Sequence, residues 1–416
     1  LVGSAVIDYF LAQAIGNANN PSHKKRLLIL SIMMNLGILA LFKYADFAIS
    51  SVAEFLAVLG YNASLPTLSW VLPVGISFYT FQSLSYTIDV YRGDMKPRKG
   101  LAEFTTALAF FPQLVAGPIL RARHILPQFH KLPVPTWDMV KMGFLLITVG
   151  LFKKTIADLL VAPVATTFDG GAVSLLETWT GVLAFAGQIY GDFSGYSDMA
   201  IGIALLIGFK IPLNFRLPYF ALSPVDFWKR WHISLSTWLR DYLYISIGGK
   251  YQRTRNIMIT MLLGGLWHGA AWTFVAWGFF HGMIIIATHQ LAYMKIFIGF
   301  ATSQKFYIKF IKWLITFYLI MVTWVLFRAT NLDSAIDIIL NMHNLISLPQ
   351  SGMHAISIFV LTVVALLFMH LMDLFVIKKS TGFINKWWIF WPVLVLIQGI
   401  CLLFGEPSNA FIYFQF

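Results

Sequence analysis

Three histidines stand out in the stretch from Asp226 to Gly282, because the sequence around them is largely apolar and aromatic. They are His232, His268 and His281, and six tryptophans share the stretch with them. A neutral imidazole can take up or release a proton near neutral pH, so general acid or base catalysis is the chemistry that these residues could perform. Ionisable groups are costly at membrane depth, and by default they face a cavity, a partner or a substrate path. We therefore expect a functional site here.

His268 is the clearest candidate for a general base. It follows an apolar run from Ile257 to Leu266 and stands between Trp267 and Gly269, away from any polar cluster. His281 lies thirteen residues further along the chain. At about 3.6 residues per turn the two histidines would point to different sides of one helix, so we expect His281 to be structural.

His232 falls on an apolar stripe with the spacing of an amphipathic helix. The stripe consists of Trp228, Trp231, Leu235, Trp238, Leu239 and Tyr242, and the opposite face carries Lys229, Arg230, Ser236, Arg240 and Asp241. The pattern predicts a helix near the membrane surface, with its tryptophans against the bundle or in the lipid boundary. For His232 itself two interpretations stay open, a functional group or a packed histidine bonded to a carbonyl group.

Two motifs in this stretch resemble the signature of the membrane-bound O-acyltransferase family. They read WHISLSTWLRDYLYI and GGLWHGAAWTFVAWGFFHG, and they are most similar to the bacterial branch that contains the inner-membrane component of alginate O-acetylation. Three further segments resemble the same branch: GDFSGYSDMAIGIALLIGF (191–209), FFPQLVAGPILR (110–121) and LFKYADF (41–47). The family has another hydrophobic stretch before the position where this chain begins, so the resemblance implies a clipped amino terminus.

The resemblance implies an all-α polytopic membrane protein, one domain over residues 1–416, with membrane segments around a central tunnel. From the apolar runs we expect roughly ten to twelve segments, some broken or re-entrant. In the family the histidine of the WHG motif, here His268, is the catalytic one. An acyl thioester reaches it from the cytoplasm, and the acceptor hydroxyl comes from the other side. His232 matches a second prominent histidine, and we expect it to orient a substrate or to stabilise the oxyanion.

The function implied is that of an O-acetyltransferase, with acetyl-coenzyme A as donor and an exported polysaccharide of the alginate type as acceptor. Peptidoglycan O-acetylation and teichoic-acid D-alanylation are the alternatives within the family. A transporter or channel, or a non-catalytic scaffold, is the alternative outside it. A transporter more often shows charged residues along a path or a repeated half, and the sequence has no such repeat.

Composition excludes a soluble globular protein, because 58% of the residues are hydrophobic, only 12% are charged, and the mean hydropathy is +0.73. The net charge of +12 comes from short Lys and Arg clusters between apolar runs, which is typical of cytoplasmic loops. No nucleic-acid partner is implied, and the family resemblance implies a location in the bacterial inner membrane. The clearest expected spans are 27–44, 139–164, 179–208, 313–327, 356–375 and 387–404.

A polar cluster interrupts the apolar run over residues 179–208. It consists of Asp192, Ser194, Tyr196 and Asp198, set between glycines. The pattern predicts a broken helix whose polar groups are satisfied by protein or face an aqueous pocket. Helix caps and substrate-facing groups are equally compatible with it.

Lys250, Arg253 and Arg255 follow a glycine pair and could attract the phosphates of coenzyme A at the cytoplasmic mouth of the tunnel. Plain positive-inside topology explains them equally well. The chain has one cysteine, and no two histidines near the core have the close spacing of a helical metal pair, so we predict no metal.

The tail over residues 405–416 contains Glu406 and no Lys or Arg, which places it outside the cytoplasm. Its end has the spacing Phe-x-Tyr-x-x-Phe around Tyr413, which resembles the carboxy-terminal acyl-carrier motif of relatives. The resemblance implies that the Tyr413 hydroxyl accepts the acetyl group and passes it to a serine (SGNH-type) enzyme in the periplasm. The alternative is an aromatic anchor at the membrane interface.

Overall fold

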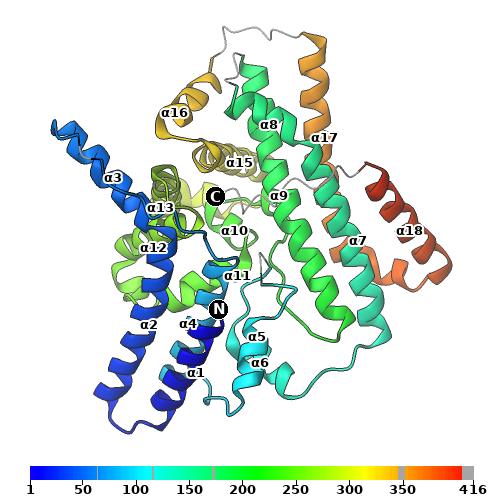
Figure 1. Cartoon of the computed structure of the whole chain (residues 1–416). Coiled ribbons are helices and arrows are strands. Elements are labelled where there is room, and N and C mark those ends of the chain that lie inside the picture. The colour runs from blue at the N-terminus through cyan, green and yellow to red at the C-terminus, as the bar shows by residue number, and fades with distance from the viewer. Residues whose placement is uncertain (63, 115–116, 171–173, 345–351, 405–416) are drawn as a thin grey trace.

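Helices form all the regular structure of the described residues in a computed structural model of the chain (Figure 1). The structure describes residues 1–62, 64–114, 117–170, 174–344 and 352–404. A bilayer favours helices, because each backbone N–H and C=O group is then paired within its own segment. The all-α prediction is therefore confirmed over the described residues.

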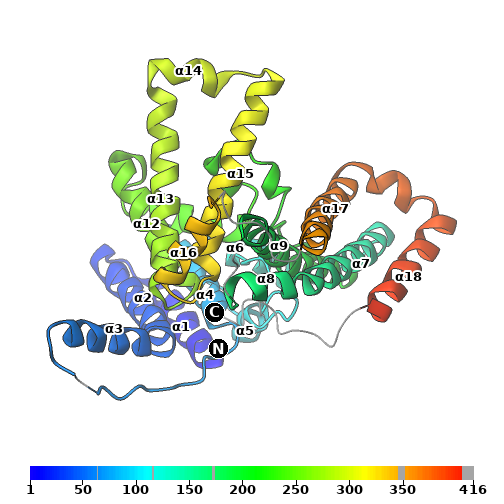
Figure 2. The same cartoon turned by 90° about the horizontal axis from the view of Figure 1, so that it is seen from above.

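Three amino-terminal helices pack against one another, namely α1 (Val2–Asn17), α2 (Pro21–Lys43) and α4 (Ile76–Arg92). A buried carboxylate joins them: Asp8 accepts hydrogen bonds from Ser31 (2.6 Å) and Asn35 (2.7 Å) of α2, and another from Ser83 of α4. In contrast, α3 (Ala45–Val58) has no buried residue and extends away from the other helices (Figures 1 and 2).

The middle of the chain forms a second group of helices, which is completed by two helices from the carboxy-terminal part. Its members are α7 (Trp137–Leu159), α8 (Val161–Phe168), α9 (Leu175–Leu206), α17 (Met353–Ile384) and α18 (Trp387–Phe404). The backbones of α7 and α9 lie so close together where Gly150 faces Gly195 that a Cβ atom at Gly150 would overlap the Gly195 carbonyl oxygen. Small residues allow such close packing of membrane helices.

The predicted break in the polar cluster of α9 is wrong, because the helix runs through it without interruption. Two lysines of α7 satisfy the acidic side chains instead. Lys153 Nζ lies 2.7 Å from Asp198 Oδ2 and also pairs with Asp373 of α17. The adjacent Lys154 lies 3.0 Å from Asp192. Since these charges are paired inside the protein, the helix need not unwind to satisfy them.

A third group of helices follows in the chain: α12 (Arg253–His268), α13 (Trp272–Tyr293), α14 (Lys295–Thr302), α15 (Phe306–Arg328) and α16 (Leu332–Asn341). Figure 2 shows α14 joining α13 to α15 at the outer edge of the molecule. Short elements connect the groups, namely α5 (Leu101–Leu108), α6 (Ala122–His130), η1 (Pro218–Phe220), α10 (Pro224–Trp228), α11 (Ile233–Trp238), the π-helix η2 (Leu239–Tyr244) and η3 (Gly249–Gln252).

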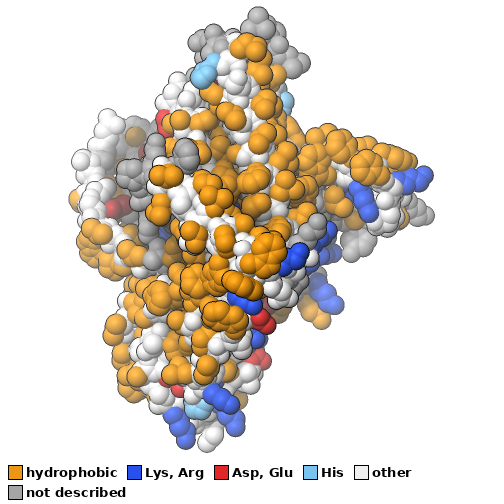
Figure 3. Space-filling view, turned by 90° about the vertical axis from the view of Figure 1, so that its right-hand side faces the viewer, with side chains coloured by type: hydrophobic (Ala, Val, Ile, Leu, Met, Phe, Trp, Pro, Cys, Tyr) orange, Lys and Arg blue, Asp and Glu red, His pale blue; other side chains and the backbone are white. Residues whose placement is uncertain are grey.

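Four helices of the described part are long and apolar enough to cross a membrane: Pro21–Lys43, Trp272–Ala292, Phe306–Arg328 and Met353–Lys378. Three of them agree with the spans expected at 27–44, 313–327 and 356–375, whereas the total of ten to twelve segments is not confirmed. On the face in Figure 3, hydrophobic side chains cover most of the middle, and Lys and Arg lie at its lower end, at its right-hand tip and in the region between these two. Such a surface suits a bilayer with basic residues outside its apolar layer.

The largest hydrophobic core lies where α9, α10, α11, α12 and α15 meet. It is strongly aromatic, and its most deeply buried large side chains include Trp231, Trp277, Trp324 and Tyr190. Trp231 and Trp238 are both buried in it, so these two tryptophans of the predicted stripe face the bundle. His232 and His268 lie within the same region.

Candidate active site

His232 lies at a break between two short helices, so the single amphipathic helix predicted over residues 228–242 is wrong. α10 ends at Trp228 and α11 begins at Ile233. His232 has φ 44° and ψ 54°, a left-handed conformation that a continuous right-handed helix cannot contain. The Ile233 N–H bonds instead to the Asn214 carbonyl at 2.9 Å, outside the helix. His232 is fully buried at this break, with 0% exposure.

A single asparagine holds His232 and the first turn of α11. Asn214 Oδ1 lies 3.2 Å from His232 Nδ1 and accepts hydrogen bonds from the Ser234 N–H (3.2 Å) and hydroxyl (2.8 Å). Its amide nitrogen donates to the Ser197 hydroxyl of α9 at 3.2 Å. Because an amide oxygen only accepts, the contact favours the tautomer with hydrogen on Nδ1 of His232. His232 Nε2 is then a bare acceptor, and it has no hydrogen-bond partner among the described residues.

His268 is the last residue of α12 and is 5% exposed. Its ring is surrounded by other aromatic rings. The ring centroids of Trp267, Trp277 and Phe327 each lie 5.1 Å from that of His268, and all three approach edge to face. These three rings belong to α12, α13 and α15, so side chains of three helices surround one imidazole with apolar groups.

The structure brings the two predicted catalytic histidines together. The ring centroids of His232 and His268 lie 6.5 Å apart, and Trp267 contacts both rings. A reacting group at hydrogen-bond distance from one imidazole is therefore close to the other. Such a group would sit in a water-poor setting, where proton transfer and electrostatic stabilisation are most effective.

His281 does not belong to the helix of His268, so the reasoning that placed both on one helix is wrong. α12 ends at His268 and a new helix, α13, begins at Trp272. His281 Nδ1 accepts a hydrogen bond from the Trp228 indole N–H at 3.2 Å, and Trp277 contacts both histidine rings. This bond ties α13 to α10, which supports the structural role expected for His281.

Lys250, Arg253 and Arg255 lie at the opposite end of α12 from His268. With a rise of about 1.5 Å per residue, the helix separates Arg255 from His268 by roughly 20 Å. Arg255 donates to the Ile247 carbonyl at 3.1 Å, while Lys250 is exposed. The three basic residues are therefore not part of the histidine site.

The π-helix η2, which precedes these basic residues in the chain, carries an acidic anchor. Asp241 lies 2.7 Å from Arg121 and 2.6 Å from Arg240. Burial alone would raise the pKa of Asp241, but the hydrogen bonds from the two guanidinium groups outweigh it and hold the pKa below its ordinary value.

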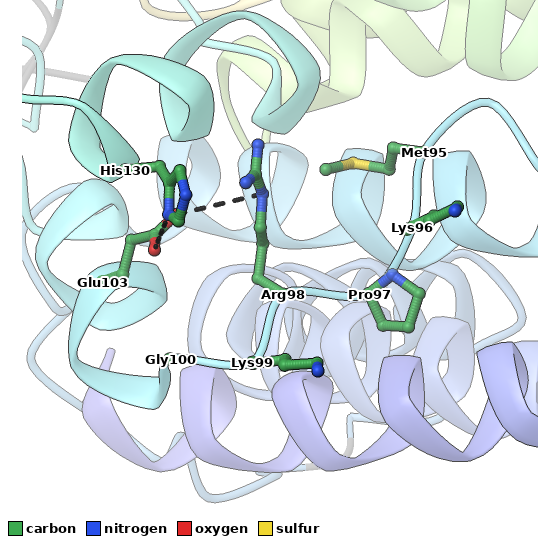
Figure 4. A pocket seen from close by; sticks show the side chains of 8 residues that line it. All are labelled: Met95, Lys96, Pro97, Arg98, Lys99, Gly100, Glu103 and His130. Carbon is green, nitrogen blue, oxygen red and sulfur yellow. Dashed lines mark ion pairs between the residues drawn. The ribbon is translucent and has the colours of Figure 1, made fainter.

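A separate surface pocket lies beside the loop that follows α4 (Figure 4). Its lining residues are Met95, Lys96, Pro97, Arg98, Lys99, Gly100, Glu103 and His130. Glu103 lies 3.9 Å from Arg98 and 3.5 Å from His130, and Figure 4 shows these ion pairs as dashed lines. The glutamate offsets part of the basic charge, and none of the predicted site residues lines this pocket.

Tyr413 lies outside the described residues. In the described part of the chain, no cluster of three or more His, Cys, Asp or Glu side chains could hold a metal ion. Sequence reasoning missed Asn214 and Phe327, since neither falls in a recognisable motif. Asn214 is found only through the contact that an extended segment makes with the turn at His232.

Comparisons with known proteins give one matching family and several relatives. A family model described as MBOAT, membrane-bound O-acyltransferase family, matches residues 98–328, which include both histidines and Asn214. The peptidoglycan O-acetyltransferase of Helicobacter pylori is 34% identical over 473 residues, which cover 100% of this chain and 87% of that relative.

Two relatives carry the name "Probable alginate O-acetylase AlgI". The protein from Pseudomonas aeruginosa is 43% identical over 339 residues, covering 80% of this chain and 63% of the relative. The protein from Azotobacter vinelandii is 44% identical over 337 residues, covering 79% of this chain and 65% of the relative. The matched part of the chain thus spans slightly less than two thirds of the length of these two relatives.

Proposed function

Because the chain belongs to the membrane-bound O-acyltransferase family, we propose that it is an O-acetyltransferase of the bacterial inner membrane. It moves acetyl groups from a cytoplasmic donor across the membrane for the O-acetylation of an exported polysaccharide of the alginate type. The observation that carries the proposal is the pair His232 and His268, buried together among aromatic rings at the end of α12.

In this proposal His268 is the general base. Its imidazole removes the proton of the acceptor hydroxyl while the oxygen attacks the carbonyl carbon of the acetyl thioester. The tetrahedral intermediate then expels the thiolate as the C–S bond breaks, and the protonated imidazole returns its proton to the sulfur. The products are an acetate ester and a free thiol, so no net proton is gained or lost.

His232 orients the acceptor in the same scheme. Its Nδ1 is committed to Asn214, so Nε2 offers a lone pair and not a hydrogen. Its lone pair can accept a hydrogen bond from another N–H or O–H group of the acceptor, since the single hydrogen of the reacting hydroxyl goes to His268, whereas an oxyanion needs a donor. Of the two roles expected for His232, substrate orientation therefore fits this tautomer better.

Acetyl-coenzyme A is the proposed donor, and its phosphates bind near Lys250, Arg253 and Arg255. The distance of roughly 20 Å between Arg255 and His268 requires a donor with a long arm between its phosphates and its thioester. We expect charge-neutral variants of the three residues to raise KM for acetyl-coenzyme A but not for a truncated acetyl thioester without phosphates. Equal effects on both donors would favour plain positive-inside topology.

The alternatives within the family differ in the polymer that is modified and, for D-alanylation, in the acyl group that is transferred. The alginate relatives support an alginate-type polysaccharide, while the Helicobacter pylori relative aligns with the whole chain and supports peptidoglycan. Teichoic-acid D-alanylation is the third alternative. Supplying isotopically labelled acetyl-coenzyme A and D-alanyl carrier protein to membranes that contain this chain distinguishes the acyl groups, and isolation of the labelled polymer identifies the acceptor.

Tyr413 is proposed as the covalent relay between His268 and a periplasmic serine acetyltransferase. The tyrosine oxygen attacks the acetyl thioester, and the resulting ester passes to the serine hydroxyl of the partner. Tyr413→Phe removes only the hydroxyl, so it tests the relay without changing the aromatic packing of an anchor. Delivery of acetyl groups outside at the parental rate by this variant would leave Tyr413 as a membrane anchor.

The decisive experiment measures transfer or hydrolysis of acetyl-coenzyme A by the purified protein in detergent or vesicles, with His268→Ala as the matched variant. We expect turnover by the parental protein and none by His268→Ala, with equal insertion and melting of the two proteins. A variant that works as well as the parent would remove His268 from the chemistry. An inactive parent that instead carries a solute across vesicles would favour the transporter alternative.

A further inference from the structure

Two neighbouring side chains bind three consecutive carbonyl groups at the end of α12. Lys43 Nζ donates hydrogen bonds to the carbonyl oxygens of Trp267 (2.6 Å) and His268 (3.0 Å). The Tyr44 hydroxyl donates to the carbonyl oxygen of Leu266 at 2.7 Å. The last carbonyl groups of a helix lack partners within the helix, so Lys43 and Tyr44 supply what the final turn of α12 needs.

The same segment also contacts the beginning of the next helix. Phe47, at the start of α3, packs edge to face against Trp272, the first residue of α13, with ring centroids 5.5 Å apart. The segment therefore contacts both sides of the short connection from Gly269 to Ala271. Lys43, Tyr44 and Phe47 all belong to LFKYADF, a motif that the histidine chemistry alone leaves unexplained.

We propose that Lys43 is a positioning residue for His268, with Tyr44 as its partner. The Lys43 ammonium group fixes the backbone at His268 by donating hydrogen bonds to the carbonyl oxygens of His268 and Trp267. The imidazole is thereby held opposite His232, with the two ring centroids 6.5 Å apart. The catalytic part of this inference rests on the proposed function.

A cation suits this position for a second reason. The carboxy-terminal end of a helix carries partial negative charge, and a Lys or Arg placed there is stabilising. Lys43 is half-buried beside the Trp267 ring, with Nζ 6.0 Å from its centroid, so solvent screens its charge less than at the surface. An arginine can replace both the charge and the hydrogen bonds, whereas a methionine of similar length replaces neither.

The test compares Lys43→Met, Lys43→Arg and Tyr44→Phe with a control, Lys25→Met, at the exposed other end of α2. We expect Lys43→Met to lower kcat at least about tenfold, because a misplaced base slows the chemical step. KM for acetyl-coenzyme A should change less than about threefold, since the proposed phosphate site is remote. Lys43→Arg should recover most of kcat, and Tyr44→Phe should lie between the two lysine variants. A kcat for Lys43→Met within about twofold of the parent would overturn the proposal.

A second readout does not depend on catalysis. Hydrogen exchange followed by mass spectrometry should show exchange that is at least about tenfold faster in the peptide spanning residues 262–272 for Lys43→Met. Lys25→Met should leave the exchange rate of this peptide unchanged. If the parental protein proves inactive, the proposed function fails while this measurement still tests the contact. Unchanged exchange in both Lys43→Met and Tyr44→Phe would show that the two side chains do not hold the end of α12.

Discussion

His232 and His268 lie with their ring centroids 6.5 Å apart, although one precedes α11 and the other ends α12. Neither residue is in the interior of a helix. His232 occupies a left-handed break held by Asn214, and His268 occupies a helix end held by Lys43. Residues held in uncommon backbone conformations often cluster at functional sites, where the surrounding structure fixes them. The pair therefore depends on the groups that hold each backbone.

The left-handed conformation of His232 allows its ring and its backbone to be tested separately. Asparagine tolerates this conformation better than alanine, so His232→Ala should be less stable than His232→Asn by about 1 kcal/mol. Both variants lose the imidazole, and we expect both to lose at least about a hundredfold in transfer rate. Melting in detergent and acetyl-transfer assays measure the two effects. Parental activity in His232→Asn would return His232 to the role of a packed histidine.

Asn214 should behave as the anchor of His232. Asn214→Ala leaves His232 Nδ1 and the Ser234 N–H and hydroxyl without their acceptor, which should cost about 1–3 kcal/mol. We also expect a clear loss of turnover, because the imidazole is no longer held in one tautomer. Asn331→Ala is the control, since Asn331 caps α16 at an exposed position. It should lower stability by about 1 kcal/mol and leave turnover unchanged. Similar turnover in both variants would contradict the anchor.

The sequence was most informative where the signal is local. The apolar run at 387–404 coincides with α18, and the run at 27–44 lies almost wholly within α2, because length and hydropathy act within one segment. His232 and His268 were also found from the sequence, since an imidazole among tryptophans is unusual in a membrane segment. The family resemblance gave each histidine a role, and the structure adds that their ring centroids lie 6.5 Å apart.

The errors came from interactions between distant segments. Nothing in the spacing of residues 228–242 shows that an extended segment at Asn214 competes for the Ile233 N–H and breaks the helix. In α9 the acidic cluster looked unsatisfied because its partner, Lys153, lies on another helix. The contact of Lys43 with the end of α12 likewise joins residues more than 200 positions apart. Such contacts follow from packing, which a periodicity argument does not contain.

The ion cluster between α7, α9 and α17 gives a prediction for stability. Lys153→Met leaves Asp198 and Asp373 facing each other without a cation, and loss of one partner from a buried network should cost about 3–5 kcal/mol. The double variant Lys153→Met with Asp198→Asn should recover part of this cost, because it removes one of the unpaired carboxylates. Lys131→Met, in an exposed loop, should change stability by less than about 0.5 kcal/mol. Thermal unfolding in detergent compares these three variants with the parent. Equal melting temperatures of Lys153→Met and Lys131→Met would argue that the ion cluster does not stabilise the protein.

Two adjacent glycines near the end of α12 give a matched pair of substitutions. A Cβ atom at Gly265 would overlap the Phe274 carbonyl oxygen of α13 and lie 3.2 Å from Gly278. A Cβ atom at Gly264 meets only the flexible end of Leu239, at 3.3 Å. Both positions are helical, so an alanine gains about 1 kcal/mol in helix propensity at either one. Only the contact with α13 differs between them.

We therefore expect Gly264→Ala to fold and work like the parent. In Gly265→Ala the added methyl group collides with the backbone of α13 and pushes α12 away from it. Because the displaced helix ends three residues later at His268, turnover should fall by at least about a hundredfold, the loss that a misplacement of about 1 Å can cause. Acetyl transfer measured at matched amounts of monodisperse protein separates this effect from poor expression. Equal turnover of the two variants would mean that the spacing of α12 and α13 does not set the position of His268.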